Sequence, residues 1–354
     1  MEITLYTKSD LIQKAGEFFP PFSTQIPITR QRLISLIRNP IAEDSDVLFI
    51  AAVIDNEWAG YISLIPEIAH TKNESIKMAW LSAWYVNPKY SKDSVASIIF
   101  LRAYGLYNRK VAAAGYSEQA AGLYENSSFF FELTKKTGFD YIFKTEKSAQ
   151  KPFRNLITSC LNSIIVTRQK SKLNSFPVGK FSVEVFNQID TNMEAWIQNN
   201  DRNFVFRKNQ KALEWILKNP WVLQGLESKD IKNRYYFSSS EKQFFYLPCC
   251  VYDEKEIISI FVLRCRDEYF TIPYYICNNH HQAMAQVLLK ILTAYKAKTF
   301  TCFYQELNDE IEKLYWPCYK KKLVDRRFYF SKSLKKFDFS TRKIHDGEGD
   351  LIFT

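Results

Sequence analysis

Few residues in this chain of 354 have the type and spacing that site chemistry requires. His280 and His281 stand side by side before a predicted helix, where imidazole N–H groups could donate hydrogen bonds to a phosphate; the alternative is a solvated pair without a ligand. Gly347 and Gly349 have the only GxG spacing, in a polar stretch, and no HExxH or GxSxG sequence occurs. These absences exclude the usual nucleotide-loop, zinc-helix and hydrolase-elbow fingerprints, and we expect no metal.

Composition sets broad limits on the fold and the partners. The length suggests two domains of roughly 150 to 200 residues each. A net charge of +10 favours anionic partners, such as nucleotide phosphates, acidic carriers, nucleic acid or an anionic membrane surface. No apolar run reaches the length of a membrane span, and the cysteines, which include no CxxC pair, are typical of reduced thiols. We therefore expect a cytoplasmic protein.

Several segments of the first half recur in the second half in the same order. LISLIRNP (33–40) resembles LEWILKNP (213–220), and the strand, turn and strand of VIDNEWAGYISLI (53–65) recur in VYDEKEIISIFVL (251–263). Each hairpin is followed by a central strand, a helix, a short strand, another helix and a closing strand. The paired segments are 78–86 and 269–277, 94–107 and 282–295, 110–117 and 298–304, and 139–144 and 326–332. The pattern predicts two copies of one α/β unit, each with a mixed sheet flanked by helices.

A predicted helix at 151–170 connects the two copies. Its apolar residues recur at helical spacing and form one continuous stripe, which we expect to pack against a domain. They are Phe153, Leu156, Ile157, Cys160, Leu161, Ile164 and Ile165. The predicted boundaries are 1–148 for the first domain, 149–175 for the connecting helix, 176–337 for the second domain and 338–354 for a polar tail that we expect to fray.

The order of elements in each copy resembles that of the GCN5-related N-acetyltransferase (GNAT) superfamily, and two copies in a row resemble its tandem members. The resemblance implies two GNAT-like acyl-CoA N-acyltransferase domains. It implies direct attack of a neutral primary amine on the thioester of acetyl-CoA or another acyl-CoA, without a metal. In this family the central strand splays away from its neighbour, and a backbone N–H there stabilises the developing oxyanion.

The family's pyrophosphate loop has the form Q/R-x-x-G-x-G/A and leads into a helix whose N-terminus favours anions. The resemblance assigns three key loop positions in each copy. They are Ser91, Ser94 and Ala96 in the first copy and His280, Ala283 and Ala285 in the second. Only Ala96 fits the pattern in the first loop, and the second loop agrees no better, although it keeps small residues.

A second family signature is an asparagine followed seven residues later by a helical tyrosine, whose hydroxyl can protonate the departing thiolate. Asn308 and Tyr315 have this spacing in the second copy, whereas Ser127 and Thr134 stand at the matching positions of the first. Tyr315 is therefore the candidate acid; the alternative is a tyrosine that packs at the edge of the core. The resemblance favours the second copy as the catalytic one.

Candidates for the base and for the substrate contacts complete the expected site. Asp267 and Glu268 open the second central strand, where either carboxylate could remove the amine proton, although both also fit an ordinary turn. Cations cluster before the two repeated helices, which border the acceptor site in the resembled family. These expected substrate contacts are Arg30, Arg32, Arg207 and Lys208.

Three functions are compatible with the sequence. The first is an N-acyltransferase that acts on a small-molecule or peptidyl amine, including a tRNA-linked one. The second is a non-catalytic relative that binds a ligand or partner, which the divergent loops would explain. The third is a basic nucleic-acid-binding protein, which only the charge and the basic, aromatic C-terminus support. The acceptor, the acyl group and the oligomeric state are not specified by the sequence.

Overall fold

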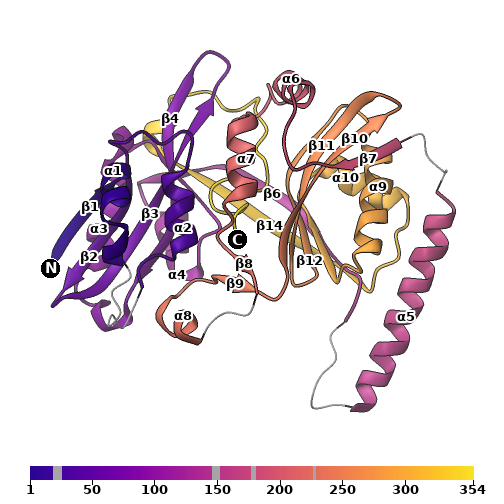
Figure 1. Cartoon of the computed structure of the whole chain (residues 1–354), viewed down its shortest axis with the longest axis horizontal. Helices are drawn as coiled ribbons and strands as arrows, with labels where there is room; N and C mark the ends of the chain where they lie inside the picture. The colour runs from indigo at the N-terminus through magenta and orange to yellow at the C-terminus, as the bar shows by residue number, and fades with distance from the viewer. Residues whose placement is uncertain (19–25, 146–151, 177–180, 226–228) are drawn as a thin grey trace. The chain divides into compact units, whose positions relative to one another are not determined.

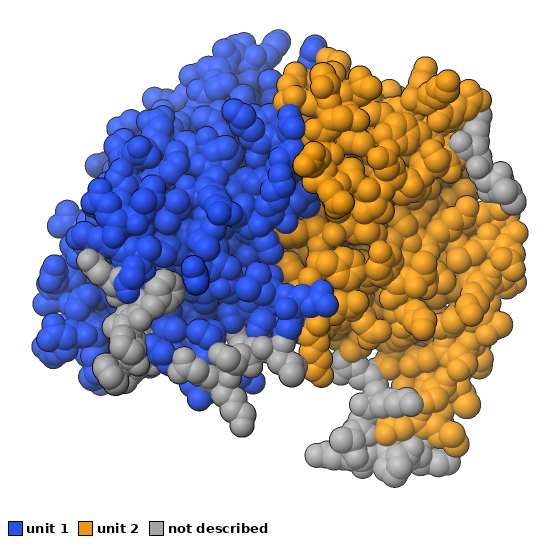
Figure 2. Space-filling view, in the orientation of Figure 1, with its two compact units in different colours: residues 1–135, 201–241, 327–354 blue, residues 136–200, 242–326 orange. Residues whose placement is uncertain are grey.

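The chain forms two compact units. The computed structural model describes residues 1–18, 26–145, 152–176, 181–225 and 229–354. Unit 1 comprises Met1–Lys135, Asp201–Glu241 and Arg327–Thr354, and unit 2 comprises Lys136–Asn200 and Lys242–Arg326 (Figure 2). Each unit therefore contains segments of both sequence repeats.

Unit 1 contains a mixed sheet flanked by helices (Figure 1), and β4 and β5 are parallel neighbours in this sheet. The strand order is β1 (Glu2–Thr7), β2 (Val47–Ile54), β3 (Glu57–His70), β4 (Ser75–Val86), β5 (Val111–Ala114) and β14 (Lys320–Ser331), of which the residues from Arg327 onward belong to this unit. The helices are α1 (Lys8–Gln13), α2 (Arg30–Ile37), α3 (Val95–Gly105), α4 (Glu118–Asn126), α7 (Gln210–Lys218) and α8 (Lys229–Arg234). A separate parallel pair is formed by β8 (Leu223–Gln224) and β9 (Ser240–Glu241).

The two faces of β3 contact different parts of unit 1. On one face, Ile62 and Leu64 belong to a core that α3 completes through Ile99. The alternating side chains of Tyr61 and Glu67 point to the other face, where they contact the segments that flank α7. The helices α2 and α7, which contain LISLIRNP and LEWILKNP, pack together, and Trp215 Nε1 donates a hydrogen bond of 2.8 Å to the carbonyl oxygen of Ser35.

Unit 2 repeats the architecture. Its strand order is β6 (Phe130–Ile142, in this unit from Lys136), β13 (Thr299–Cys302), β12 (Tyr269–Cys277), β11 (Glu256–Arg266), β10 (Phe244–Asp253) and β7 (Phe181–Val185). Its helices are α5 (Pro152–Asn174), α6 (Thr191–Asn200), α9 (His281–Ala294) and α10 (Gln305–Lys313). The core gathers apolar residues of these strands around α9, including Phe261, Phe270 and Leu288. The predicted mixed sheet flanked by helices is confirmed.

The closing strands are exchanged between the two sequence repeats. β14, the closing strand of the second repeat, pairs with β5 of the first, with Tyr329 opposite Ala113. β6, the closing strand of the first repeat, pairs with β13 of the second, with Tyr141 opposite Phe300. The compact units therefore interleave along the chain. The boundaries 1–148, 149–175, 176–337 and 338–354 follow the order of the repeats instead and stay a prediction; residues 149–151 lie outside the described part.

One helix of the first copy was placed wrongly from the sequence. The segment that contains Thr134 is not helical but forms strand β6, and Ser127 is the residue directly after α4. The helix after β5 is α4, which begins nine residues earlier than Ser127 at Glu118. The alternation of apolar residues in FFELTKKTGFDYI has the period of a strand, and this signal outweighs the helical propensity of its lysines and leucine.

The apolar stripe of α5 does not pack as predicted. Leu156 is 64% exposed and Ile164 is 49% exposed. The buried face of α5 contains Thr158 and Gln169 instead, and Gln169 Nε2 donates to the carbonyl oxygen of Pro317 at 2.9 Å. The hydrogen bond of Gln169 offsets the cost of burying its polar side chain. Among the described residues, no helix has the length and apolarity needed to cross a membrane.

The close approach of β6 to the end of β13 gives a stability prediction. A methyl group at Gly138 would lie 2.3 Å from the carbonyl oxygen of Cys302 and 2.9 Å from Cα of Phe303. Because backbone atoms cannot rotate away, we expect Gly138→Ala to lower the free energy of unfolding by about 1–3 kcal/mol. Gly122→Ala in α4 is the control, since nothing lies within 4 Å of the added methyl. Urea unfolding that gives equal values for both variants would contradict the steric explanation.

Candidate active site

The central strand of unit 1 contains a bulge at the point where it leaves its parallel neighbour. The last β4 residue that pairs with β5 is Leu81. Between the pairs Ser82–Ser63 and Tyr85–Tyr61, β4 has one residue more than β3, and Ala83 in this segment has a φ of +48°. A non-glycine residue in the left-handed region is unusual in a strand and turns its backbone N–H out of the ladder.

The central strand of unit 2 has the corresponding bulge but not the donor. The last β12 residue that pairs with β13 is Thr271, and the register shifts directly after it. Pro273 lies two residues after the last parallel pair, as Ala83 does in unit 1, although it is the second residue of its bulge and Ala83 is the first. Proline has no backbone N–H, so this position cannot donate a hydrogen bond. The carbonyl oxygen of Pro273 instead accepts from the hydroxyl of Tyr304 at 3.4 Å.

Asp350 from the C-terminal segment lies at the bulge of unit 1. Its Oδ2 accepts a hydrogen bond from Oγ of Ser82, and the backbone N–H of Ala83 also donates to its carboxylate. Burial raises the pKa of Asp350 above its ordinary value, although these hydrogen bonds and the charge of Arg32 act in the opposite direction. The bulge amide thus faces a carboxyl oxygen, and that oxygen belongs to a group whose raised pKa suits it to accept a proton.

The C-terminal segment is buried, so the prediction that it frays is wrong. Phe353 stacks on Trp221 with ring centroids 5.1 Å apart, and it is 1% exposed. The segment approaches β5 so closely that a methyl group at Gly115, whose φ is +62°, would lie 2.6 Å from Cδ2 of Leu351. Only glycine fits this approach without strain. The segment that looked like a polar tail is therefore part of the core of unit 1.

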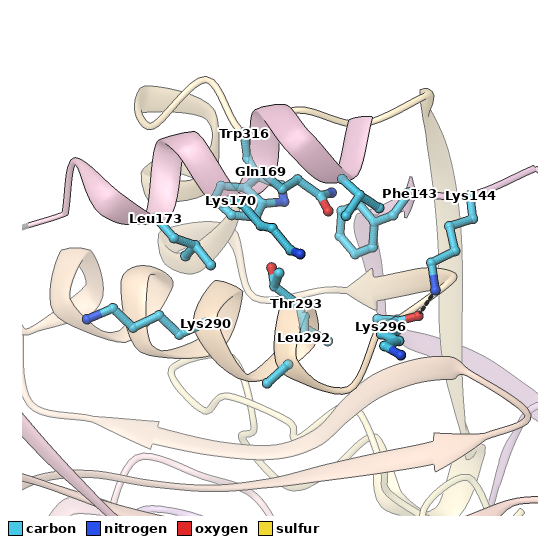
Figure 3. A pocket seen from close by; sticks show the side chains of 13 residues that line it. Phe143, Lys144, Gln169, Lys170, Leu173, Lys290, Leu292, Thr293, Lys296 and Trp316 are labelled. Carbon is cyan, nitrogen blue, oxygen red and sulfur yellow. Dashed lines mark hydrogen bonds between the residues drawn. The ribbon is translucent and has the colours of Figure 1, made fainter. Parts of the chain in front are cut away.

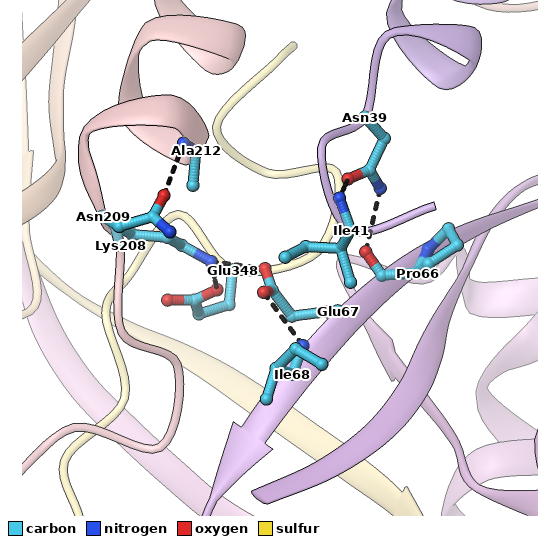
Figure 4. Close-up of polar contacts among 9 residues, drawn as sticks. All are labelled: Asn39, Ile41, Pro66, Glu67, Ile68, Lys208, Asn209, Ala212 and Glu348. Carbon is cyan, nitrogen blue, oxygen red and sulfur yellow. Dashed lines mark hydrogen bonds and ion pairs between the residues drawn. The ribbon is translucent and has the colours of Figure 1, made fainter. Parts of the chain in front are cut away.

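A buried ion cluster fixes the segment next to the sheet (Figure 4). Lys208 Nζ lies 2.5 Å from Oε2 of Glu67 on β3 and 2.9 Å from Oε2 of Glu348. Burial alone would lower the pKa of Lys208, but the two carboxylates outweigh it and raise the pKa well above its ordinary value. Lys208 was predicted as a substrate contact; in the structure both of its carboxylate partners are protein groups.

Tyr124 is a second candidate group at this site, and the sequence prediction did not include it. It lies on α4, seven residues after Ser117, the residue that precedes the helix, and it is 4% exposed. Burial and then the charge of Asp350 raise its pKa, so the hydroxyl stays protonated at neutral pH. Among the described residues, no group forms a hydrogen bond with this hydroxyl. A protonated hydroxyl without a hydrogen-bond partner, near enough to Asp350 for that charge to raise its pKa, has the properties of a general acid.

The first of the two predicted pyrophosphate loops has a suitable backbone. Ser94 precedes α3 with a φ of +56°, the conformation that glycine favours in such loops, and Ala96 lies in the first helical turn. Ser91 ends the short helical turn Pro88–Tyr90 just before it. The first N–H groups of α3 have no intrahelical acceptor, so they can donate to an anion. These three residues surround one helix N-terminus.

The second predicted loop is different. Ala283 and Ala285 lie inside α9 and are 8% and 0% exposed, so neither belongs to a loop. His280 is the residue before α9, and a hydrogen bond of 2.8 Å joins Nδ1 of His281 to the hydroxyl of Tyr275. His280 and His281 therefore stand at the N-terminus of α9, while the two alanines are buried inside the helix.

The other predicted residues of the second copy are dispersed. Tyr315 is 85% exposed, with a φ of +47°, just after α10. Asn308 is fully buried, where Oδ1 accepts from the hydroxyl of Tyr141 at 3.2 Å and Nδ2 donates to the carbonyl oxygen of Cys302 at 3.1 Å. Glu268 is exposed in the turn before β12, with an oxygen 3.8 Å from Nζ of Lys144. Asn308 therefore has a structural role, and Tyr315 and Glu268 face solvent.

The remaining predicted substrate cations have separate environments. Arg30 is exposed, and an Nη of Arg207 donates to the carbonyl oxygen of Arg202 at 3.2 Å. Arg32 is 3% exposed, with its guanidinium carbon 4.6 Å from the ring centre of Trp221. The charge of Arg32 lowers the pKa of Asp350, against the larger effect of burial.

Unit 2 contains a cavity of about 460 Å³ between α5 and α9 (Figure 3). Its lining combines apolar side chains such as Leu173 and Trp316 with four lysines. Those lysines are Lys144, Lys170, Lys290 and Lys296. The cavity lies along the C-terminal part of α9, whereas a pyrophosphate loop would precede that helix. None of the predicted catalytic or cofactor-binding residues lines it.

Comparisons with known proteins give a match only by structure. No family model and no curated protein matches the sequence. N-myristoyltransferase from Saccharomyces cerevisiae with bound myristoyl-CoA superposes with a TM-score of 0.54 at 9% identity, covering 93% of this chain and 82% of that one. A GCN5-related N-acetyltransferase from Anabaena variabilis gives 0.51 at 9% identity, covering 93% and 72%.

This chain has the GNAT fold.

A further match, described as a probable N-acyltransferase from Enterococcus faecalis, has a TM-score of 0.52 at 8% identity and covers 93% of this chain and 72% of that one. The likeness confirms the predicted resemblance at the level of the fold. At such low identity the site residues of the GNAT fold cannot be transferred from these structures, and they have to be argued from the geometry of this chain.

Proposed function

We propose that this protein is an acyl-CoA-dependent N-acyltransferase and that unit 1 carries the reaction. One observation supports the choice of unit 1 most directly: the N–H of Ala83 in the β4 bulge donates to a carboxyl oxygen of Asp350, whereas Pro273, at the same distance from the last parallel pair of β12, has no N–H. A preorganised donor at the point where negative charge develops is usually a large catalytic contribution. The acyl donor would be acetyl-CoA or another acyl-CoA, and its pyrophosphate would lie at Ser91, Ser94 and Ala96.

Each group at the bulge has a separate chemical role in this proposal. The thioester oxygen would replace the Asp350 oxygen at the Ala83 N–H, and Asp350 would keep its hydrogen bond from Ser82. The amine nitrogen would form the new bond to the acyl carbon and pass a proton to Asp350. The carbon–sulfur bond would then break, and Tyr124 would donate its proton to the thiolate. Proton transfer from Asp350 through solvent would restore Tyr124.

Calorimetric titration with acetyl-CoA tests the proposal. We expect saturable binding in the micromolar range and competition by desulfo-CoA or CoA. The absence of heat at high micromolar acetyl-CoA and at equal concentrations of longer acyl-CoA thioesters would contradict an acyltransferase function. The seven cysteines are all unbonded, which supports the further proposal of a reducing, cytoplasmic location.

Replacement of Tyr124 should show whether unit 1 or unit 2 is the catalytic copy. We expect Tyr124→Phe to lower kcat by about tenfold to a hundredfold, because the leaving thiolate loses its proton donor. Tyr315→Phe is the matched variant in the second copy and should leave kcat unchanged. Release of CoA can be followed with a thiol reagent. A large loss for Tyr315→Phe and none for Tyr124→Phe would move the acid to the second copy, where Tyr315 and Glu268 were predicted.

A non-catalytic binding protein is the second candidate function, and one observation favours it. Asp350 occupies the Ala83 N–H in the structure, and a permanently docked C-terminal segment would exclude a thioester from the bulge. In that case acyl-CoA would compete with the segment and no amine would be acylated.

A further inference from the structure

A small pocket lies in unit 1 beside the bulge. It has a volume of about 260 Å³ and is lined by Tyr61, Tyr85 and the segment from Lys232 to Tyr236. Tyr61 and Tyr85 are cross-strand partners, and Tyr85 follows Ala83 by two residues. The pocket therefore opens next to the strand position at which acyl transfer is proposed.

The described lining of this pocket is cationic and aromatic. Lys232 and Arg234 line it, and no carboxylate belongs to its described lining. The ring of Tyr236 packs on that of Tyr85 with centroids 4.8 Å apart. Aromatic walls with two cations and no acid among the described lining residues favour a ligand group that is negatively charged and compact.

The hydroxyl of Tyr235 points to the same conclusion. Tyr235 lines the pocket and is 6% exposed, yet within the described part of the chain its hydroxyl has no hydrogen-bond partner. A buried hydroxyl without a partner is costly, so a ligand oxygen that accepts its hydrogen bond would remove the cost. Burial raises the pKa of Tyr235, which keeps the hydroxyl a donor.

A buried positive charge lies behind Tyr235. The guanidinium carbon of Arg32 is 5.4 Å from the centre of the Tyr235 ring, and Nη2 donates to the carbonyl oxygen of Ser238 at 3.2 Å. Nε has no partner, and no described carboxylate forms an ion pair with Arg32. Its charge influences both Tyr61 in the pocket and Asp350 at the bulge. A buried cation without an ion-pair partner stabilises an anion that binds nearby.

We propose that this pocket holds the anionic group, a carboxylate or a phosphate, of an acceptor whose amine lies at Asp350. The inference rests on the proposed acyltransferase function and names its substrate class, which is a small amine with an anion a few bonds away. The carboxyl group of Asp350 and the positively charged pocket recognise opposite ends of such a molecule. A neutral amine or a polyamine lacks the group that the pocket binds.

Matched pairs of amines test the substrate class. Glycine is compared with glycinamide, β-alanine with β-alaninamide, and phosphoethanolamine with ethanolamine, each with acetyl-CoA and detection of released CoA. We expect the anionic member of at least one pair to have a kcat/KM at least about tenfold higher, as the loss of a charged hydrogen bond predicts. The carboxylate and phosphate pairs distinguish the two sources of charge. Equal use of neutral and anionic members in all three pairs would overturn the proposal.

Pocket variants separate recognition from folding. Lys232→Gln, Arg234→Gln and Tyr235→Phe should each raise KM for the preferred anionic amine by about tenfold to a hundredfold, with kcat and the Kd of acetyl-CoA unchanged. KM for the neutral amine of the same pair should not change. A structural defect would instead alter KM for both amines. Lys211→Gln, an exposed lysine of α7, is the control. Unchanged KM values in all three pocket variants would overturn the proposal.

Direct measurement of amine binding distinguishes failure of the pocket assignment from failure of the acyltransferase function. Binding of glycine, β-alanine and phosphoethanolamine is measured by calorimetry without acyl-CoA. If one of them binds and the pocket variants lose it while acetyl-CoA gives no heat, the pocket is supported and the acyltransferase function fails. If acetyl-CoA binds and none of the three anionic amines binds or is acetylated, the acyltransferase function stands and the pocket assignment fails.

Discussion

Asp350→Asn should lower kcat by about a hundredfold to a thousandfold while the Kd of acetyl-CoA changes by less than about twofold. The substitution preserves the shape of the side chain and an oxygen that can accept from Ser82 and Ala83, but it removes the ability to take a proton. Turnover is measured with the preferred amine and saturating acetyl-CoA. Asp338→Asn, an exposed carboxylate earlier in the C-terminal segment, is the matched control and should keep full activity.

The pH dependence gives a second signature of Asp350. A base acts in its ionised form, and burial raises the pKa of Asp350 above its ordinary value, so kcat should fall as the pH falls through that raised pKa. In Asp350→Asn this acidic limb should disappear from the residual activity. A limb that persists unchanged would show that another group takes the proton and would remove Asp350 from the mechanism.

The stability of the same variant should move in the opposite direction from its activity. Because the pKa of Asp350 is higher in the folded state than in the unfolded state, its contribution to stability is greatest at low pH and is lost as the pH rises through the folded-state pKa. At neutral pH the asparagine variant should therefore be at least as stable as the parent protein. A loss of activity without a loss of stability distinguishes a chemical role from a folding defect.

The fold could be predicted from the sequence because the same elements recur in the same order in both halves of the chain. Two hairpins, two central strands and two following helices recur in order, and the period of apolar residues identified most of them. The exchange of β6 and β14 could not be predicted in this way. Both strands alternate apolar and polar residues equally well, and nothing local to them determines whether β5 or β13 is their partner.

The site was placed less well than the fold, for different reasons at different residues. Pro273 was visible in the sequence, but YFTIPYYIC aligned with MAWLSAWYV places it opposite Ser82. Only the parallel register seen in the structure places it, like Ala83, two residues after the last parallel pair. Tyr124 was missed because the helix after β5 was assigned to residues that form β6. In the structure that helix is α4, and Tyr124 lies on it. Asp350 was missed because a polar segment is buried only when distant partners satisfy it, and its partner Ser82 is 268 residues away.

Lys208→Met should destabilise unit 1 by about 3–5 kcal/mol, the usual cost of removing one partner from a buried ion cluster. Lys208 is 6% exposed, and its loss leaves Glu67 and Glu348 facing each other without a counter-charge. Urea unfolding followed by tryptophan fluorescence measures the change. Lys211→Met on the surface of α7 is the control and should change the free energy of unfolding by no more than about 0.5 kcal/mol.

The same substitution links the ion cluster to catalysis. Glu348 precedes Asp350 by two residues. Release of Glu348 should therefore displace the carboxylate of Asp350 from Ser82 and Ala83, and it should lower kcat even where the protein remains folded. Adding Glu67→Gln and Glu348→Gln to Lys208→Met removes both unpaired charges and should recover part of the lost stability. If the triple variant also recovers activity, the cluster acts by holding Asp350 at the bulge. Stability in Lys208→Met within about 1 kcal/mol of the parent would contradict a structural role for the cluster.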